Sequence, residues 1–330
     1  MQGAIGAAEG LRRTNPTALC AGMKRLLVAL ILCASVALGF AQSPVLVSKP
    51  VRPIPAVEHI VIISIDGLRP DRALIANMPT LRTMLRDGAY TFWAKTTAVS
   101  ITLPSHTSMI TGVIPRKHGI EWNVDLPLSQ PVYPKVPTLM EMAGKAGYVT
   151  AMIAGKDKFE FLNKPGTITH VYISPKATGT NDEVATEAEK IIAADRPAVT
   201  FVHFPDVDVA GHAKGWGSRE QLAAIEKTDT HLARIFAALD AAGIRGSTVV
   251  LLTADHGGAG LTHGADDPRS RHIPWIIVGP GVRKNFDLTQ IEALEVRTED
   301  TCATACWLLG LPQMPYFDGH PVLTAFDPVQ

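Results

Sequence analysis

The sequence predicts an α/β fold in which helices cover both faces of a mainly parallel sheet. Two observations carry this prediction: runs of β-branched and other apolar residues recur along the chain, and segments with helical spacing lie between them. Such runs form strands that are buried on both faces, and we assign them to residues 59–65, 148–153, 199–204, 247–252 and 273–278. Alternation of these strands with helices favours parallel pairing through helical connections.

The helical segments are identified by apolar residues that recur every three or four positions. The clearest spans 218–241, where one face is shared by Leu222, Ile225, Leu232, Ile235, Phe236 and Leu239. We predict further helices over 79–85, 139–146 and 298–309. Three of these four segments lie between predicted strands, as the alternation requires.

The composition is that of a globular protein. The chain has 330 residues, of which 46% are hydrophobic and 19% charged, and this excludes disordered, collagenous and coiled-coil proteins. Its 31 basic residues balance 31 acidic ones, so no nucleic-acid surface is indicated. Because the composition does not change after residue 58, we predict one catalytic domain over 58–330, preceded by a Pro-rich lead-in over 42–57.

The N-terminus has the features of an export signal. Lys24 and Arg25 precede an apolar run that ends at the small residue Ala41. We assign 1–41 to an N-terminal extension and signal peptide, the latter over about 23–41, and expect a periplasmic or secreted protein. An uncleaved membrane anchor is the alternative, but the run is shorter than the roughly 20 residues that span a bilayer. We therefore expect no stable membrane insertion after cleavage.

Residues with metal-ligand chemistry follow three of the predicted strands at the points where the strands end. Asp66 follows the first strand, and Asp208 and His212 follow the strand over 199–204 on what reads as a tight turn. Asp255 and His256 follow the strand over 247–252. The carboxyl ends of parallel strands meet at one edge of a sheet, where functional residues gather. We therefore expect these side chains to lie close together.

Aspartate and histidine in this mixture favour zinc, in a catalytic rather than a structural site. His263, on a Gly-rich loop, brings the set to six, which is too many for one tetrahedral ion with an open position. Six ligands suit two ions that clamp a phosphoryl group. The alternative for any single aspartate is a helix cap or turn. We expect His203, His231 and His272 to be structural or surface residues.

Thr102 is the candidate nucleophile. It stands where a loop enters a short helix with Pro104 in its first turn. Backbone N–H groups at a helix N-terminus can hold an anion, and a bound metal can lower the pKa of a hydroxyl group. The alternative is that Thr102 only caps the helix.

Six ordered motifs resemble the alkaline phosphatase superfamily, and most closely its type I phosphodiesterase/nucleotide pyrophosphatase branch. They lie at 65–70, 102–112, 118–123, 208–212, 254–258 and 262–264. The similarity extends over roughly residues 57–325, and six motifs in order are far more specific than one short pattern. No Cys or Ser stands in a C/S-x-P-x-R context at the nucleophile, which disfavours the sulfatase branch.

The resemblance implies roles for individual residues. One zinc would be held by Asp66, Asp255 and His256, with Thr102 as the metal-bound nucleophile, and the second by Asp208, His212 and His263. Asn123 matches an asparagine that donates to a phosphate oxygen. The branch forms a covalent phosphothreonine, which a zinc-activated water then hydrolyses. Asp206 is the alternative to Asp208, whose four-residue spacing to His212 fits the family pattern.

The substrate is indicated less directly. Lys156 and Lys158, just past the strand over 148–153, can reach an anionic substituent, and we assign them to substrate binding together with Asn123. A solvated pair that opens a helix is the alternative. If the lysines face the site, a small doubly charged substrate such as a phosphonocarboxylate is favoured. Three aromatic residues can either stack a nucleobase or pack in the interior, namely Phe92, Trp93 and Trp122.

The leading hypothesis is an exported two-zinc hydrolase that cleaves phosphodiester or pyrophosphate bonds of a small nucleotide-like substrate through Thr102. The alternative on the same site is a phosphomonoesterase or a phosphonate hydrolase, which needs extra donors for the additional oxygen charge. An alternative from another class is a zinc-dependent binding protein without turnover. Such a protein would lack a ligand or the nucleophile, and the sequence contains them all.

Overall fold

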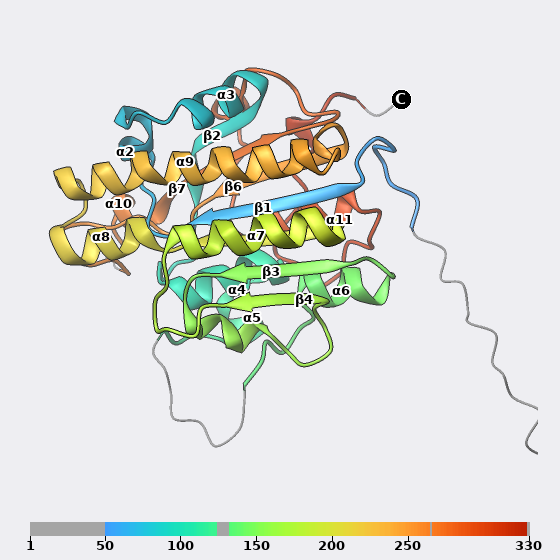
Figure 1. Ribbon diagram of the computed structural model, residues 1–330, viewed down its shortest axis with the longest axis horizontal. Coiled ribbons are helices and arrows are strands. Elements are labelled where there is room, and N and C mark those ends of the chain that lie inside the picture. Colours follow the sequence, from blue (N-terminus) through green and yellow to red (C-terminus); the bar gives the residue numbers. More distant parts are fainter. Residues whose placement is uncertain (1–49, 124–131, 265, 329–330) are drawn as a thin grey trace, which may run out of the picture. The chain divides into compact units, whose positions relative to one another are not determined.

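The structure is a computed structural model that describes residues 50–123, 132–264 and 266–328. The predicted signal peptide and the start of the lead-in lie outside the described residues. The described residues form an eight-stranded sheet in the order β4-β3-β5-β1-β6-β7-β2-β8 (Figure 1). In chain order the strands are β1 (His59–Ile65), β2 (Gly88–Lys95), β3 (Thr150–Ala154), β4 (His170–Ile173), β5 (Val199–Phe204), β6 (Thr248–Thr253), β7 (His272–Val278) and β8 (Phe286–Asp287).

The sheet is mainly parallel, as the sequence predicted. Strands β4, β3, β5, β1 and β6 run parallel to one another, and β7 pairs antiparallel with both β6 and β2. Every residue of β5 and β6 is buried, and so is all of β1 beyond its first residue. The continuous apolar runs are explained by this burial, because these strands have helices on both faces.

Helices cover both faces (Figure 1). On one face, α9 (Arg219–Ala241) packs against α2 (Pro70–Ile75), α3 (Pro79–Asp87), α7 (Asn181–Asp195) and α8 (Asp206–Lys214). On the other, α4 (Thr102–Thr111) packs against α5 (Pro115–His118), α6 (Leu139–Lys145) and α11 (Asp300–Leu308). The short elements are α10 (Pro268–Arg271) and the 3₁₀ turns η1 (Asp157–Leu162), η2 (Arg245–Ser247), η3 (Leu288–Gln290) and η4 (Leu323–Ala325). No helix in the described part of the chain is long and apolar enough to cross a bilayer.

The carboxyl ends of four parallel strands, and the loops that follow them, lie at one edge of the sheet. Asp66 follows β1, Lys156 follows β3 and Asp255 follows β6 at that edge. Asp208 follows β5 there too, but it lies with His212 in the first turns of α8 rather than on the predicted tight turn. The expected proximity survives, because residues four apart share one face of a helix.

Candidate active site

A cavity of about 510 Å³ opens at this edge of the sheet. Its lining includes sequence-predicted residues from five separate segments, namely Thr102, Asn123, Lys156, Lys158, Asp208, His212 and His263. Asp66, Asp255 and His256 lie beside it and are fully buried. The structure thus gathers all the residues that the sequence analysis assigned to the site.

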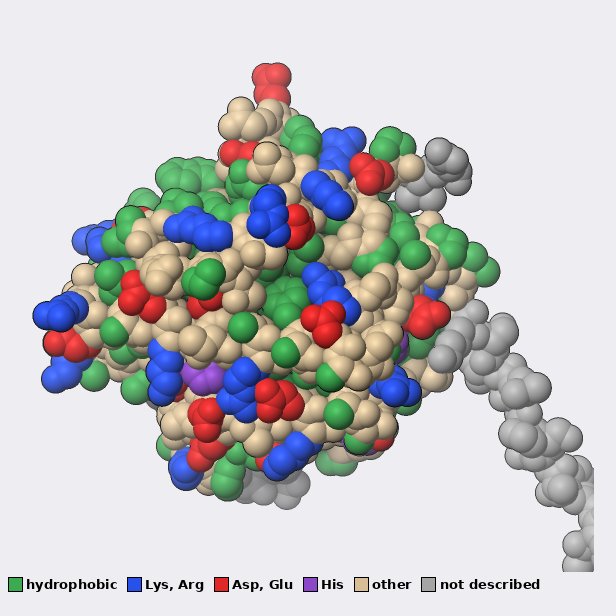
Figure 2. Space-filling model, turned by 45° about the horizontal axis from the view of Figure 1, so that its top comes forward, with side chains coloured by type: hydrophobic (Ala, Val, Ile, Leu, Met, Phe, Trp, Pro, Cys, Tyr) green, Lys and Arg blue, Asp and Glu red, His purple; other side chains and the backbone are tan. Residues whose placement is uncertain are grey.

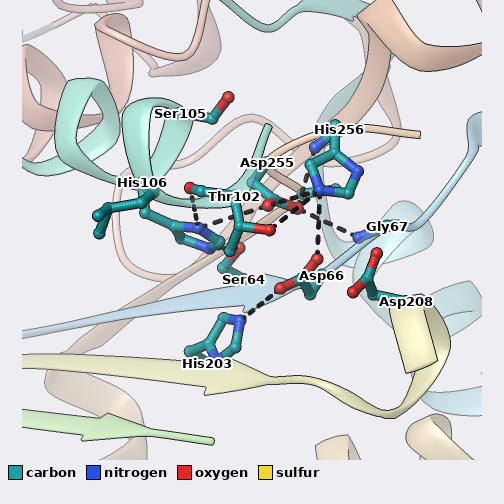
Figure 3. A network of polar contacts seen from close by, with 12 residues as sticks. Ser64, Asp66, Gly67, Thr102, Ser105, His106, His203, Asp208, Asp255 and His256 are labelled. Carbon is teal, nitrogen blue, oxygen red and sulfur yellow. Dashed lines mark hydrogen bonds and ion pairs between the residues drawn. The ribbon is translucent and has the colours of Figure 1, made fainter. Parts of the chain in front are cut away.

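The first predicted ligand group converges on one ring nitrogen (Figure 3). Nε2 of His256 lies 3.4 Å from Oδ1 of Asp66 and 3.1 Å from Oδ2 of Asp255. It also lies 3.4 Å from Oγ1 of Thr102. Nδ1 of His256 is 2.8 Å from the carbonyl oxygen of Gly257, which can only accept, so Nδ1 carries the proton. The lone pair of Nε2 therefore points at the two carboxylates and the hydroxyl group.

The second group has the same polarity. Oδ1 of Asp208 lies 3.4 Å from Nε2 of His212 and 3.7 Å from Nε2 of His263. These two ring nitrogens are 3.1 Å apart. Their Nδ1 atoms donate to the carbonyl oxygens of Leu261 and Ser100, at 3.0 and 2.9 Å. Both Nε2 lone pairs therefore face each other and Asp208, an arrangement that could hold a metal ion.

Three buried carboxylate oxygens without hydrogen-bond donors in the described part of the chain also point to cation binding. Oδ1 of Asp66, Oδ1 of Asp208 and Oδ2 of Asp255 are buried and accept no hydrogen bond from the described residues. Burial, with the nearby Asp66 carboxylate, raises the pKa of Asp255 well above its usual value. Unpaired buried carboxylates are costly, and metal coordination is one of the few ways to retain them. The residues present therefore fit divalent cations.

Figure 3 shows Thr102 beside His256 and Asp66, at the end of α4 that faces the site. Thr102 is the first residue of α4, and Ile101 rather than Thr102 occupies the cap position. The Thr102 side chain is buried, and its Oγ1 contacts His256 instead of a backbone N–H. Oδ1 of Asn123 accepts a hydrogen bond from the backbone N–H of Leu103, at 2.9 Å. Asn123 is therefore fixed beside the nucleophile candidate.

Lys156 and His203 donate hydrogen bonds to the second oxygen, Oδ2, of the ligand carboxylates: Lys156 to Asp66 and Asp208, and His203 to Asp66. Lys156 Nζ donates to Oδ2 of Asp66 and of Asp208, at 2.7 and 2.6 Å. Nδ1 of His203 accepts from the N–H of Gly155, so its Nε2 donates to Oδ2 of Asp66, at 2.9 Å. Burial opposes ionisation of Asp66, but Lys156 and His203 outweigh it and lower the pKa of Asp66 well below its usual value. The sequence analysis had predicted a structural or surface role for His203. The residue is fully buried, and its contact with Asp66 gives it a structural role inside the site.

His106 was not singled out from the sequence, although it lies four residues after Thr102. Its Nδ1 donates to the backbone carbonyl of Thr102 and its Nε2 accepts from the hydroxyl of Ser64, both at 2.8 Å. Nδ1 also lies 3.4 Å from Oδ2 of Asp255. Burial lowers the pKa of His106 well below its usual value, so the ring is neutral. It ties the start of α4 to β1.

Trp216 was also missed. Its Nε1 donates to the carbonyl oxygen of Gly67 at 2.9 Å, and its ring stands edge-on to His212, with centroids 4.9 Å apart. An added Cβ at Gly211 or Gly258 would lie within 2.8 Å of the indole. The glycines next to the ligands are thus the signal that a large side chain packs behind them.

Other candidates lie away from these groups. Asp206 exchanges hydrogen bonds with Asn181, so the alternative to Asp208 is not at the ligand cluster. His272 stacks on Trp93, with centroids 4.2 Å apart, and both line a separate cavity with Phe92. Two other candidates make ring contacts: His231 lies against Phe204, and Trp122 lies edge-on to Phe161.

Comparison with known proteins identifies the family. A family model described as type I phosphodiesterase / nucleotide pyrophosphatase matches residues 60–268. The chain belongs to this family. The match contains β5, β6, all of β1 but its first residue, and all six predicted ligands, and it places the chain in the alkaline phosphatase superfamily.

Curated relatives of this family member are longer proteins. The bis(5'-adenosyl)-triphosphatase ENPP4 of Bos taurus is 24% identical over 213 residues, which is 60% of this chain and 47% of the relative. An uncharacterized pyrophosphatase/phosphodiesterase of Schizosaccharomyces pombe is 25% identical over 216 residues, covering 60% and 44%. Arylsulfatase K of Danio rerio is 34% identical over 102 residues, covering 29% and 19%. The chain thus spans less than half the length of each.

Solved structures share the fold. Murine ectonucleotide pyrophosphatase / phosphodiesterase 5, in an inactive threonine-to-alanine variant complexed with AMP, superposes with a TM-score of 0.69 at 15% identity. The match covers 82% of this chain and all of that one. A 2-O GAG sulfatase superposes with a TM-score of 0.66 at 15% identity, covering 84% and 74%. The sheet and its two helical layers are therefore those of the superfamily.

Proposed function

We propose that the protein hydrolyses phosphodiester or pyrophosphate bonds of a small nucleotide-like substrate through a phosphothreonine on Thr102. The observation that carries the proposal is the set of buried carboxylate oxygens and of histidine lone pairs beside the Thr102 hydroxyl, at a cavity of about 510 Å³. Family membership and the nucleotide-acting relatives support it. The N-terminal signal supports export to the periplasm or medium, and 58–330 is the proposed catalytic domain.

Two zinc ions complete the proposed site. Asp66, Asp255 and His256 would hold one and Asp208, His212 and His263 the other, supplying positive charge that lowers the pKa of the attacking hydroxyl and stabilises the phosphoryl group. In the neutral ring of each histidine, the backbone carbonyl that accepts from Nδ1–H leaves the lone pair on Nε2. The chain thus sets the tautomer of all three histidines before any ion binds.

The chain's own residues then perform two displacements. Oγ1 of Thr102 gives up its proton and forms a bond to phosphorus, while the leaving oxygen departs with the electron pair of its bond to phosphorus and takes up a proton. Water then gives up a proton as it bonds to phosphorus, and Oγ1 of Thr102 leaves with the electron pair and is reprotonated. Asn123 lies where its amide can donate to a phosphoryl oxygen, and Lys158 adds charge to the same cavity. A threonine-to-alanine variant of murine ectonucleotide pyrophosphatase / phosphodiesterase 5 is described as inactive, which supports a threonine nucleophile.

A second candidate function has its own observation. Lys158 lines the cavity together with Thr102, and a positive charge there favours a substrate with more negative charge than a diester. A phosphomonoester or phosphonate dianion is such a substrate, because its extra oxygen charge needs extra donors.

The test compares a nitrophenyl phosphodiester with the matching monoester, using zinc-loaded full chain, Thr102→Ala and Thr102→Ser. We expect diester-selective turnover that falls by about three orders of magnitude in Thr102→Ala and partly returns in Thr102→Ser. Monoester-selective turnover would favour the second candidate. Turnover that survives in Thr102→Ala would refute the phosphothreonine. Absence of turnover of both esters with zinc bound would favour a phosphonate substrate, and if phosphonates are not cleaved either, a binding protein.

A further inference from the structure

The side chain of Lys156 contacts the ligand groups themselves rather than projecting into the cavity alone. Only 5% of the residue is exposed, and its Nζ lies 2.7 Å from Asp66 and 2.6 Å from Asp208. These two aspartates belong to different predicted zinc sites. Lys156 is therefore an ion-pair bridge between the two halves of the centre.

The two oxygens of each of these carboxylates have different surroundings. Lys156 takes Oδ2 of both Asp66 and Asp208. The Oδ1 atoms receive no hydrogen bond from the described residues, and each lies 3.4 Å from the Nε2 atom of a histidine of the centre. One oxygen of each aspartate is thus held by the protein, and the other faces the ring nitrogens.

The backbone of Lys156 is fixed where this bridge requires it. Residue 156 follows the end of β3 and forms a bridge with Thr178, and the preceding Gly155 donates to His203 and accepts from Gly179. His203 in turn donates to Oδ2 of Asp66, the same oxygen that Lys156 contacts. Two independent donors therefore converge on the oxygen of Asp66 that points away from the ring nitrogen of His256.

We propose that Lys156 is an internal counterion that joins Asp66 and Asp208, orients their free oxygens toward the metal sites and stabilises the metal-free fold. Its primary role is then that of a positioning residue and not of a substrate ligand. The part of this inference that concerns metal ions rests on the proposed function, whereas the ion pairs do not.

The neighbouring lysine provides a matched control. Lys158 lines the same cavity, but its Nζ donates to the backbone carbonyl of Asn123, at 3.0 Å. Replacing either lysine with methionine removes one positive charge from the cavity. Only the change at position 156 leaves two buried carboxylates without their counterion.

The experiment measures thermal unfolding of the full chain in chelator and in zinc. In chelator, we expect Lys156→Met to lower Tm by about 10 °C, because an uncompensated buried charge is strongly destabilising. Lys158→Met should lower Tm by clearly less than Lys156→Met, because Lys158 is not the counterion of Asp66 and Asp208. Zinc should raise the Tm of Lys156→Met more than that of wild type, since the ions supply the missing positive charge.

Two further variants keep the test decisive if Lys156→Met does not fold in chelator. Lys156→Arg keeps the charge and should restore most of the lost Tm. The Lys156→Met/Asp208→Asn double variant should fold in chelator even where Lys156→Met does not, and where both single variants fold, its Tm loss should be clearly smaller than the sum of theirs, because the two side chains are directly paired.

A substrate-ligand role gives a different pattern. If Lys156→Met matches Lys158→Met in chelator, shows no coupling to Asp208 and only raises KM, the inference is overturned. A wild type whose Tm does not respond to zinc would overturn the proposed metal centre and the metal-facing part of this inference. The coupling in chelator tests the ion pairs alone, so the two failures are distinguishable.

Discussion

An alanine at Gly258 should disable the site without touching a ligand. A Cβ atom there would lie 2.3, 2.4 and 2.7 Å from Cε2, Cδ2 and Nε1 of Trp216. Favourable contacts between non-bonded carbon atoms are about 3.5–4.0 Å, so the indole or the backbone must move by about 1 Å. The backbone of Gly258 is outside the left-handed region, so the contact alone causes the effect.

The displacement reaches both ligand groups. Gly258 follows His256 by two residues, and the indole donates to Gly67, the residue after Asp66. The same ring stands against His212. Catalytic groups tolerate displacements of about 0.5 Å, and a 1 Å misplacement can cost about 100-fold. We therefore expect Gly258→Ala to lower kcat/KM about 100-fold, and overpacking to cost about 1–3 kcal/mol of stability.

The assay is kcat/KM on the preferred nitrophenyl ester at saturating zinc, together with Tm. Gly246→Ala is the control, because nothing lies within 4 Å of its added Cβ and its backbone is also outside the left-handed region. A Trp216→Phe change in the Gly258→Ala background should recover part of the loss by making room. Wild-type kcat/KM in Gly258→Ala would show that the indole does not fix the ligands, and would refute this reasoning.

Three further predictions concern metal and protons. Dialysis against a chelator should abolish turnover, and zinc should restore it; turnover that persists in metal-free protein would contradict the proposed centre. His203→Leu should weaken zinc binding about 10- to 100-fold in a competition titration, because Asp66 loses a donor; unchanged zinc affinity would contradict this role. His118 is hydrogen-bonded to Ser108, and burial lowers its pKa from 6.5 to about 4. Between pH 4 and 6.5, this histidine therefore holds a proton in the unfolded chain but not in the folded one. The free energy of unfolding should therefore fall as pH drops from 6.5 to 4, by about 3 kcal/mol from this group. Urea unfolding in chelator at several pH values should show that the free energy of unfolding of His118→Gln depends less steeply on pH than that of wild type; an equal dependence would refute this prediction.

The central strands could be predicted because their burial is complete. The runs assigned to 59–65 and 199–204 coincide with β1 and β5, and the other three differ from their strands only near the ends. The missed strands are β2, β4 and β8, which lie toward the edges of the sheet. β2 is only partly buried and is irregular between Thr91 and Ala94, so no continuous apolar run marks it. Edge position weakens the hydrophobic pattern from which strands are predicted.

The candidate site could be predicted as residue types at strand ends, but not as a set of contacts. Asp66 and Lys156 are 90 residues apart, and nothing in either local sequence indicates that they pair. Lys156 was predicted from charge alone, which does not distinguish a cation that faces a substrate from one that faces two aspartates. His106 lay within a motif, but its role depends on Ser64, 42 residues away. Such contacts are set by how distant segments pack.

The polarity of the site links its stability to its proposed chemistry. Three histidines present lone pairs, and three aspartates present oxygens that no described residue satisfies. Buried acceptors without donors are destabilising, so the fold carries a cost that the proposed metal ions would relieve. Lys156 relieves part of it through Oδ2 of Asp66 and Asp208, leaving Asp255 with a raised pKa. The acceptors that remain unsatisfied lie close to the Thr102 hydroxyl, as the 3.4 Å contact with His256 shows. Phosphoryl transfer to this hydroxyl would need positive charge at the same place.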